Sequence, residues 1–233
     1  MSGLPALTAL AVAALLAGCR ALGAGPADPG LVSFAALAPE ALVQMRYAGS
    51  DNFTGGPVAG YQEPVCLLTE PAARALAAAS RELRQRGLRL VVFDCYRPQR
   101  AVDQFVRWAR EPEDAATRAR FHPRVPRAAL FAEGYIAEHS GHSRGSTVDV
   151  GLASAAPEDA GALLDLGTPF DFFDPRSHTE APEIQGAPRA WRLLLRSVME
   201  RHGFQNYEKE WWHFTLRDEP WPATTFDVPV RPP

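Results

Sequence analysis

Two short segments, residues 140–149 and 210–213, restrict the folds open to this chain more than any other feature of its sequence. The first contains His142 and Asp149, and the second contains His213. Two imidazoles and one carboxylate can hold Zn²⁺ through three protein ligands and leave the fourth tetrahedral position for water. If the three side chains form one site, the fold must bring two distant segments of the chain together.

Glu210 stands three residues before His213 and is not needed as a further ligand. A free carboxylate there could take a proton from a metal-bound water, so the pattern predicts a hydrolase. Positions three apart on a regular strand face opposite sides, so the chain must turn or bulge between Glu210 and His213 if both face one metal. Either segment alone more often contains a structural histidine, because short motifs match by chance. The two segments together favour a metal site.

Arg97 is a candidate for stabilising negative charge during the reaction. It follows the apolar run 88–93, which predicts a buried strand, so its side chain would project from a rigid strand end. A guanidinium in that place could pair with a developing oxyanion. Without the other segments, Arg97 beside Pro98 would instead be interpreted as a surface cation.

The hydrophobic pattern predicts a single α+β domain. Helices are expected over residues 70–86, 99–110 and 188–202, and strands over residues 88–93, 147–152 and 212–216. Thr69 is expected to cap the first helix and Gly87 to end it. The stretch 113–135 gives no clear pattern. On this interpretation Asp149 and His213 lie on strands that could be neighbours.

A set of motifs occurs together along nearly the whole chain after its amino-terminal end: Tyr47, residues 51–55, 94–101 and 142–146, Asp149, and residues 167–172, 176–178, 210–213 and 216–220. In this combination and spacing they resemble the VanX-type D-alanyl-D-alanine dipeptidases, which are zinc enzymes of the wider D,D-peptidase and hedgehog-like fold. The resemblance implies a mostly antiparallel sheet flanked by helices. It also implies that His142, Asp149 and His213 bind one zinc ion. Glu210 is then the general base and acid, and Arg97 steadies the tetrahedral intermediate.

The resemblance also implies where the substrate binds. Asp171 and Tyr47 are expected to hold the free ammonium of a dipeptide, because a desolvated ammonium needs an anionic partner. Asp171 could instead cap a turn, and Tyr47 could be a core residue. The family usually has Ser directly before the first histidine ligand, where this chain has Gly141. We therefore take Ser140, one residue earlier, as the candidate hydroxyl for substrate.

Length and charge agree with one compact enzyme. The chain has 233 residues, of which 46% are hydrophobic, and a formal net charge of −3. This length suits one domain of ordinary size. Basic residues are interspersed with acidic ones and form no block, so no nucleic-acid partner is expected.

The amino-terminal end predicts export. An apolar run over residues 6–17 is too short to span a bilayer but suits the core of a signal peptide. Residues 16–19 match a bacterial lipobox, so residues 1–18 are expected to be a signal peptide, with lipidation at Cys19, a linker over 19–30 and the catalytic domain over 31–233. No Lys or Arg precedes the apolar run, which argues against this interpretation. The alternative is a cytoplasmic protein.

The remaining cysteines and histidines receive structural interpretations. Cys66 and Cys95 are expected to be buried small hydrophobic residues, although an oxidising compartment would permit a disulfide between them. His122 and His202 are expected to face solvent. His139 and His178 are not expected to bind the metal.

The leading hypothesis is zinc-dependent hydrolysis of D-alanyl-D-alanine by an exported protein anchored to the membrane by lipid. An exported enzyme could meet only dipeptide released outside the cell, which favours cell-wall turnover or salvage. A cytoplasmic one could contribute to glycopeptide resistance. Two alternatives remain: a D,D-carboxypeptidase acting on longer peptidoglycan peptides, and a non-catalytic zinc-stabilised binding module. A purely structural zinc site has no use for the free carboxylate of Glu210, which argues against the second alternative.

Overall fold

The computed structural model describes residue 1 and residues 29–159 and 161–233. Apart from Met1, the predicted signal peptide lies outside the described residues, as do Cys19 and most of the predicted linker. In the part of the chain that is described, no helix is both long enough and apolar enough to cross a bilayer.

The main sheet is mixed but mostly antiparallel. Its strands run in the spatial order β2 (Leu42–Val43), β4 (Leu88–Asp94), β5 (Thr147–Ser154), β7 (His213–Leu216) and β6 (Phe204–Asn206). Only the pair β2 and β4 is parallel among these five strands. A second, two-stranded antiparallel sheet consists of β1 (Leu31–Ser33) and β3 (Leu67–Thr69). The predicted α+β fold with a mostly antiparallel sheet is confirmed.

The helices of the described residues are α1 (Glu70–Gln85), α2 (Gln99–Arg110), α3 (Ala115–Phe121) and α4 (Gly186–Arg201). The three predicted helices are confirmed as α1, α2 and α4, and α3 lies in the stretch that gave no clear pattern. Short 3₁₀ turns complete the secondary structure: Phe34–Ala36, Arg46–Ala48, Arg127–Ala129, Gly141–Arg144, Pro157–Asp159 and Pro175–Ser177.

Helix α1 begins and ends for local reasons. Pro71 stands in its first turn, where a missing N–H costs nothing, and Gly87 follows its end with a φ of +74°. Thr69 precedes the helix, but the prediction that its hydroxyl caps the helix is wrong. That hydroxyl lies 2.7 Å from the hydroxyl of Ser146 instead. Thr69 therefore ties α1 to the turn that precedes β5.

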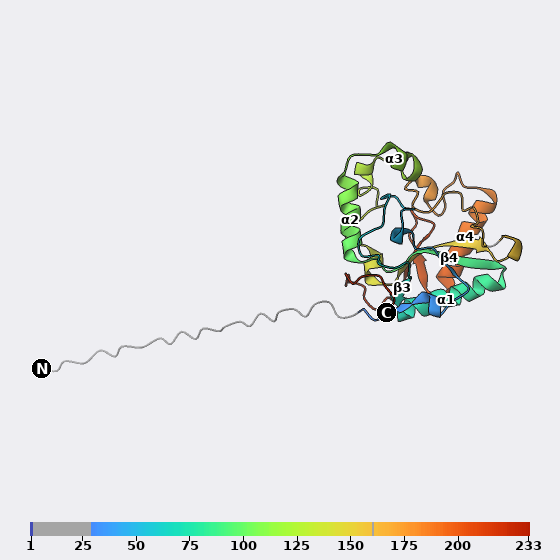
Figure 1. Cartoon of the computed structure of the whole chain (residues 1–233), viewed down its shortest axis with the longest axis horizontal. Helices are drawn as coiled ribbons and strands as arrows, with labels where there is room; N and C mark the ends of the chain where they lie inside the picture. Colours follow the sequence, from blue (N-terminus) through green and yellow to red (C-terminus); the bar gives the residue numbers. More distant parts are fainter. Residues whose placement is uncertain (2–28, 160) are drawn as a thin grey trace.

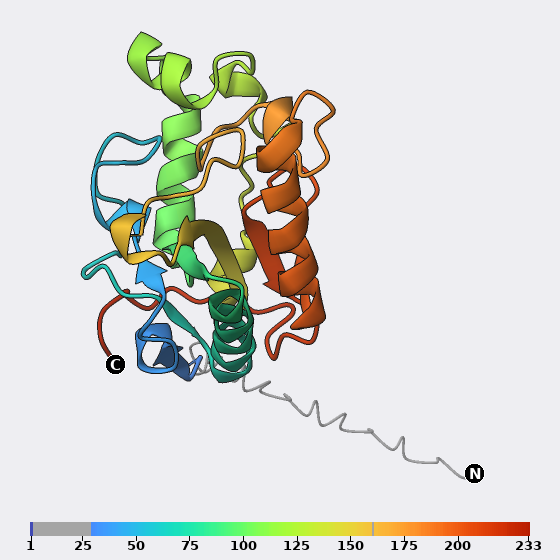
Figure 2. The same ribbon diagram turned by 90° about the vertical axis from the view of Figure 1, so that its right-hand side faces the viewer.

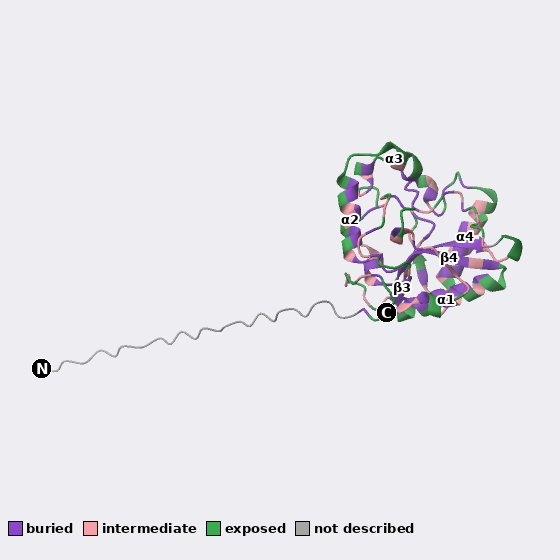
Figure 3. Cartoon of the chain, in the orientation of Figure 1, coloured by how far each residue is buried: buried purple, intermediate pink, exposed green. Residues whose placement is uncertain are grey.

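Helices α1 and α4 contact each other and pack on the sheet, α1 against β4 and α4 against β5 and β6 (Figure 2). Figure 1 places α2 on the side of the molecule away from α4. Strands β3, β4 and β5 and the inward sides of α1 and α2 are mostly buried, whereas most of α3 and the outer sides of the helices are exposed (Figure 3). Fully burying a side chain such as Leu83 contributes about 1.5–3 kcal/mol. This burial makes the sheet a rigid support for the residues at its strand ends.

Two histidines that were expected to face solvent are less exposed than predicted, to different degrees. His122 was expected to face solvent but is buried, since its ring packs edge-on against Trp108 and Nδ1 lies 3.0 Å from the carbonyl oxygen of Val125. His202 is half-buried at the end of α4, with Nε2 3.0 Å from a carboxylate oxygen of Glu82 in α1. The expectation failed for His122 because the pattern around it gave no information on tertiary packing.

Cys66 and Cys95 form a disulfide, with their Cα atoms 5.3 Å apart. Both residues are buried, as expected, but the preferred interpretation that they are unpaired is wrong. Cys66 directly precedes β3 and Cys95 directly follows β4. The bond therefore joins the small sheet to the main sheet at the end of β4, which could not be inferred from two positions 29 residues apart in sequence.

Thiol labelling tests this bond. We expect the denatured, unreduced full-length chain to expose no thiol other than that of Cys19, and reduction to add two more. In a Cys19→Ala variant the unreduced chain should show none. Two further reactive thiols before reduction would contradict the disulfide.

Candidate active site

The pairing of β5 with β7 brings the predicted metal ligands together. Asp149 is the register partner of His213 across these two strands. His142 comes from the 3₁₀ turn Gly141–Arg144, which directly precedes β5. The Nε2 atom of His142 lies 3.3 Å from Nδ1 of His213 and 3.3 Å from Oδ1 of Asp149. The Nδ1 atom of His213 lies 3.1 Å from the same oxygen of Asp149.

The spacing of these three atoms suits one metal ion. They form the single group of metal-binding side chains identified among the described residues. Four ligands at about 2.0–2.1 Å from a tetrahedral Zn²⁺ are separated from one another by about 3.3–3.4 Å. The observed separations of 3.1–3.3 Å are close to that value. Nitrogen and carboxylate donors are also the types that zinc accepts.

Each imidazole has a state suited to binding a cation. The Nδ1 atom of His142 lies 2.7 Å from the carbonyl oxygen of Cys95, and because a carbonyl can only accept, this nitrogen carries the proton. Its Nε2 lone pair is then free to face the metal position. Burial lowers the pKa of His213, although the hydrogen bond with Asp149 opposes this shift. A neutral imidazole is the form that binds a metal.

Glu210 reaches the same position through a turn, as the spacing required. The backbone N–H of His213 donates to the carbonyl of Glu210 at 3.2 Å, and that of Glu210 donates to Tyr207 at 3.0 Å. The side-chain amide of Asn206 donates to the carbonyls of both Glu210 and His213 at 3.0 Å. As a result Oε2 of Glu210 lies 3.5 Å from Nδ1 of His213.

The carboxylate of Glu210 is buried. Burial raises its pKa well above the usual range, the nearby carboxylates of Asp149 and Asp171 raise it further, and Arg97 opposes them. A carboxyl with a raised pKa is better suited to accepting and returning a proton than an ordinary surface glutamate. Glu210 is thus next to the metal position and chemically able to carry a proton.

Arg97 lies between carboxylates and aromatic rings. Its Nε donates to Asp94 at 2.9 Å, and its Nη2 lies 3.6 Å from Oδ2 of Asp149. The guanidinium carbon is 5.0 Å from the ring centroids of both Tyr47 and Phe105. The side chain is only 12% exposed, so these contacts fix its direction toward the metal position.

Asp94 and Tyr61 complete this part of the site and were not predicted. Asp94 is fully buried, and it accepts a 2.6 Å hydrogen bond from the hydroxyl of Tyr61 as well as the bond from Arg97. Asp94 stands three residues before Arg97 within one of the motifs, a spacing that could have suggested the pair. Nothing in the sequence marks Tyr61, because its contact with Asp94 depends on the tertiary fold.

Asp171 and Tyr47 also lie together. The hydroxyl of Tyr47 donates to the carboxylate of Asp171, with O–O distances of 2.9 and 3.1 Å. Burial raises the pKa of Asp171 well above its usual range, and the charge of Asp149 adds to this effect. Asp171 has a φ of +59°, the only non-glycine positive φ among the described residues. Strained backbone of this kind is concentrated at functional sites.

Most of the predicted site residues line one cavity of about 400 Å³. Its walls include Asp149 and His213 of the metal group and the candidate residues Glu210, Arg97, Asp171 and Tyr47, and unpredicted aromatic residues such as Tyr135 and Tyr207 also line it. His142 lies behind the wall, with its ring next to that of His213. Ser140 lies in the wall, and its hydroxyl accepts a 3.2 Å hydrogen bond from the backbone N–H of His142. Ser140 therefore caps the 3₁₀ turn as well as facing the cavity. His139 lies in the wall too, but outside the metal group.

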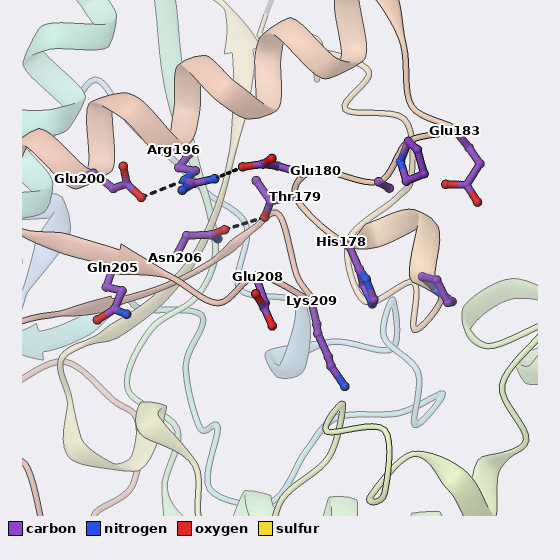
Figure 4. Close-up of a pocket in the computed structure, with 13 residues that line it drawn as sticks. His178, Thr179, Glu180, Glu183, Arg196, Glu200, Gln205, Asn206, Glu208 and Lys209 are labelled. Carbon is purple, nitrogen blue, oxygen red and sulfur yellow. Dashed lines mark hydrogen bonds and ion pairs between the residues drawn. The ribbon is translucent and has the colours of Figure 1, made fainter.

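A larger cavity of about 710 Å³ lies elsewhere and contains no residue of the metal group. Figure 4 shows Arg196 between Glu180 and Glu200, at 2.6 and 2.8 Å, so much of its charge is internally paired. His178 lies in this wall, with Nε2 3.3 Å from the hydroxyl of Tyr135. Size alone thus does not identify the site, and the converging side chains do.

The fold and this group of side chains define a metal-dependent hydrolase. A family model for peptidase M15, described as D-ala-D-ala dipeptidase, matches residues 27–231. The chain therefore belongs to the M15 family of D-Ala-D-Ala dipeptidases, as its motifs predicted.

Individual relatives support this family assignment. A D-alanyl-D-alanine dipeptidase of Streptomyces coelicolor is 45% identical over 185 residues, which cover 79% of this chain and 90% of that protein. One of Enterococcus faecalis has the same identity and the same coverage of both chains. One of Escherichia coli is 34% identical over 186 residues, covering 80% of this chain and 84% of that protein.

The backbone at Asp171 gives a stability prediction. Asp171→Asn should change the free energy of unfolding by less than about 1 kcal/mol, because Asn also adopts left-handed conformations and can still accept from Tyr47. Asp171→Val should lower it by about 1–3 kcal/mol, because a β-branched residue is strained there. Urea denaturation measures both changes. Equal losses in the two variants would show that the backbone conformation is not the cause.

Proposed function

We propose that this protein is a zinc-dependent dipeptidase that hydrolyses D-alanyl-D-alanine to two molecules of D-alanine. One observation carries the proposal: ligand atoms of His142, Asp149 and His213 converge beside the free carboxylate of Glu210, and Asp149, His213 and Glu210 line one cavity. Membership of the D-Ala-D-Ala dipeptidase family supports the substrate.

The choice of zinc follows from the donors. His142 Nε2, His213 Nδ1 and one oxygen of Asp149 would hold the ion, leaving space on the cavity side. Zinc in a three-ligand site polarises a carbonyl and lowers the pKa of a coordinated water to about 7. The close match between the observed donor separations and tetrahedral zinc supports this assignment.

Glu210 and Arg97 would then have separate roles in the reaction. Glu210 accepts a proton from the attacking water and passes it to the nitrogen that leaves as the peptide bond breaks. Its buried position and raised pKa support this role. Arg97, held by Asp94 and by the rings of Tyr47 and Phe105, pairs with the negative charge that develops on the carbonyl oxygen.

Asp171 would hold the substrate's free ammonium, with Tyr47 keeping the carboxylate in place. Burial disfavours the charged form of Asp171, and a cation bound beside it would favour that form, so the carboxylate and the ammonium would stabilise each other. Ser140 offers a further polar contact in the cavity wall. A cavity of about 400 Å³ suits a small substrate better than a long peptide.

Alanine release tests the proposal. We expect the zinc-loaded protein to release alanine from D-Ala-D-Ala and not from L-Ala-L-Ala. Glu210→Gln should lower kcat by about 10²–10⁴-fold, because the proton transfer is lost while the shape is kept. Glu208→Gln is the matched control, since Glu208 is exposed and faces the larger cavity, and it should leave kcat unchanged.

Other outcomes would identify a different function. Preferred cleavage of an acylated pentapeptide that ends in D-Ala-D-Ala would identify a D,D-carboxypeptidase. Bound zinc without cleavage of either substrate would favour a non-catalytic binding module.

We further propose that the protein is exported and anchored by a lipid on Cys19, where it acts in wall turnover or salvage. The lipobox at residues 16–19 supports the anchor. The disulfide between Cys66 and Cys95 supports an oxidising compartment, because such bonds are rare in the cytoplasm.

Cell fractionation tests the anchor. We expect the protein in the membrane fraction of the native host, and Cys19→Ala should release it from that fraction because the lipid is attached to this sulfur. A soluble cytoplasmic protein whose distribution does not change in the Cys19→Ala variant would contradict the proposal.

A further inference from the structure

The disulfide lies directly behind one of the metal-binding side chains. Cys95 is bonded through its sulfur to Cys66, and its carbonyl oxygen accepts the Nδ1 proton of His142 at 2.7 Å. The same residue is therefore covalently fixed on one side and holds an imidazole on the other. Neither sulfur belongs to the metal group.

The segments joined by the disulfide also share backbone hydrogen bonds around His142. The N–H of Tyr96 donates to Leu67 at 3.0 Å, and the N–H of Arg97 donates to the carbonyl of His142 at 3.3 Å. On the other side, the N–H of Thr69 donates to Gly145 at 2.8 Å. Strand β3 thus contacts both the end of β4 and the turn that carries His142, and these two segments also contact each other.

Backbone hydrogen bonds alone would hold β3 only weakly against the end of β4. Strand β3 has three residues and, among the described strands, pairs only with β1 in a two-stranded sheet. Sheets of that size are marginally stable by themselves. The disulfide supplies a covalent link between β3 and the end of β4, in a fully buried setting.

We infer that the Cys66–Cys95 disulfide is a positioning device for the metal centre: it fixes the Cys95 carbonyl, which orients His142 and selects its Nε2 atom as the ligand. The inference rests on the proposed metal-dependent function. Partners that hold the second nitrogen of a ligating histidine set both its orientation and its basicity. The two cysteines are thus positioning residues and not catalytic ones.

The test is the zinc affinity of a Cys66→Ala, Cys95→Ala variant, measured by competition with a chelating dye. We expect the dissociation constant to rise by about 10- to 100-fold, the usual effect of losing an outer partner of a ligand. The absorption spectrum of the Co²⁺ form should change as well, because it reports ligand geometry. Both readouts are independent of catalysis.

A matched control separates positioning from general stability. Leu83→Ala removes a buried side chain of α1, which contributes no residue to the cavity wall. It should lower the urea midpoint as the cysteine pair does, while zinc affinity and the Co²⁺ spectrum remain those of the wild type. If the alanine pair does not fold, wild-type protein reduced with a phosphine and then desalted replaces it.

Unchanged zinc affinity and an unchanged Co²⁺ spectrum in the disulfide-free protein would overturn the inference. An equal loss of affinity in Leu83→Ala would overturn it too, because the effect would then follow stability alone. If the wild type binds zinc but does not cleave D-Ala-D-Ala, the proposed function fails, and the ratio of affinities still decides the role of the disulfide.

Discussion

The pairing of β5 with β7 is the constraint on which the rest of the structure depends. Its register sets Asp149 opposite His213, and the turn before β5 adds His142. Two buried polar groups and a half-buried one that face one point are costly unless a cation or proton compensates them. The surrounding structure keeps them together: Cys95 holds one imidazole, and Asn206 holds the turn that carries Glu210. The chemistry therefore depends on strand register, which hydrophobic alternation specifies strongly.

Much of this arrangement could be predicted from sequence because its signals are local. Proline, glycine and apolar spacing marked the ends of α1, α2 and α4 to within about two residues, which is the usual uncertainty in helix ends. The metal group could be proposed because ligand types and spacing are themselves local patterns. The need for a turn between Glu210 and His213 followed from strand geometry, and the structure has that turn.

The features that could not be predicted are long-range contacts. Cys66 and Cys95 meet because β3 lies beside the end of β4, and no short pattern encodes that neighbourhood. His122 is buried through packing against Trp108, although its sequence context gave no indication of burial. Tyr61 reaches Asp94 from a part of the chain without any recognised motif. In each case a side chain acquires its environment only when separate segments are assembled.

The layer formed by α1 and α4 has a consequence for how this protein can change over time. Within the described residues, neither helix contributes to the wall of the catalytic cavity. Substitutions on their outer surfaces therefore alter solubility, charge and attachment to other molecules without a direct effect on the chemistry. The side that carries α1 and α4 can therefore accept sequence changes, engineered labels or tethers. Substitutions on the side that carries the cavity are constrained by catalysis.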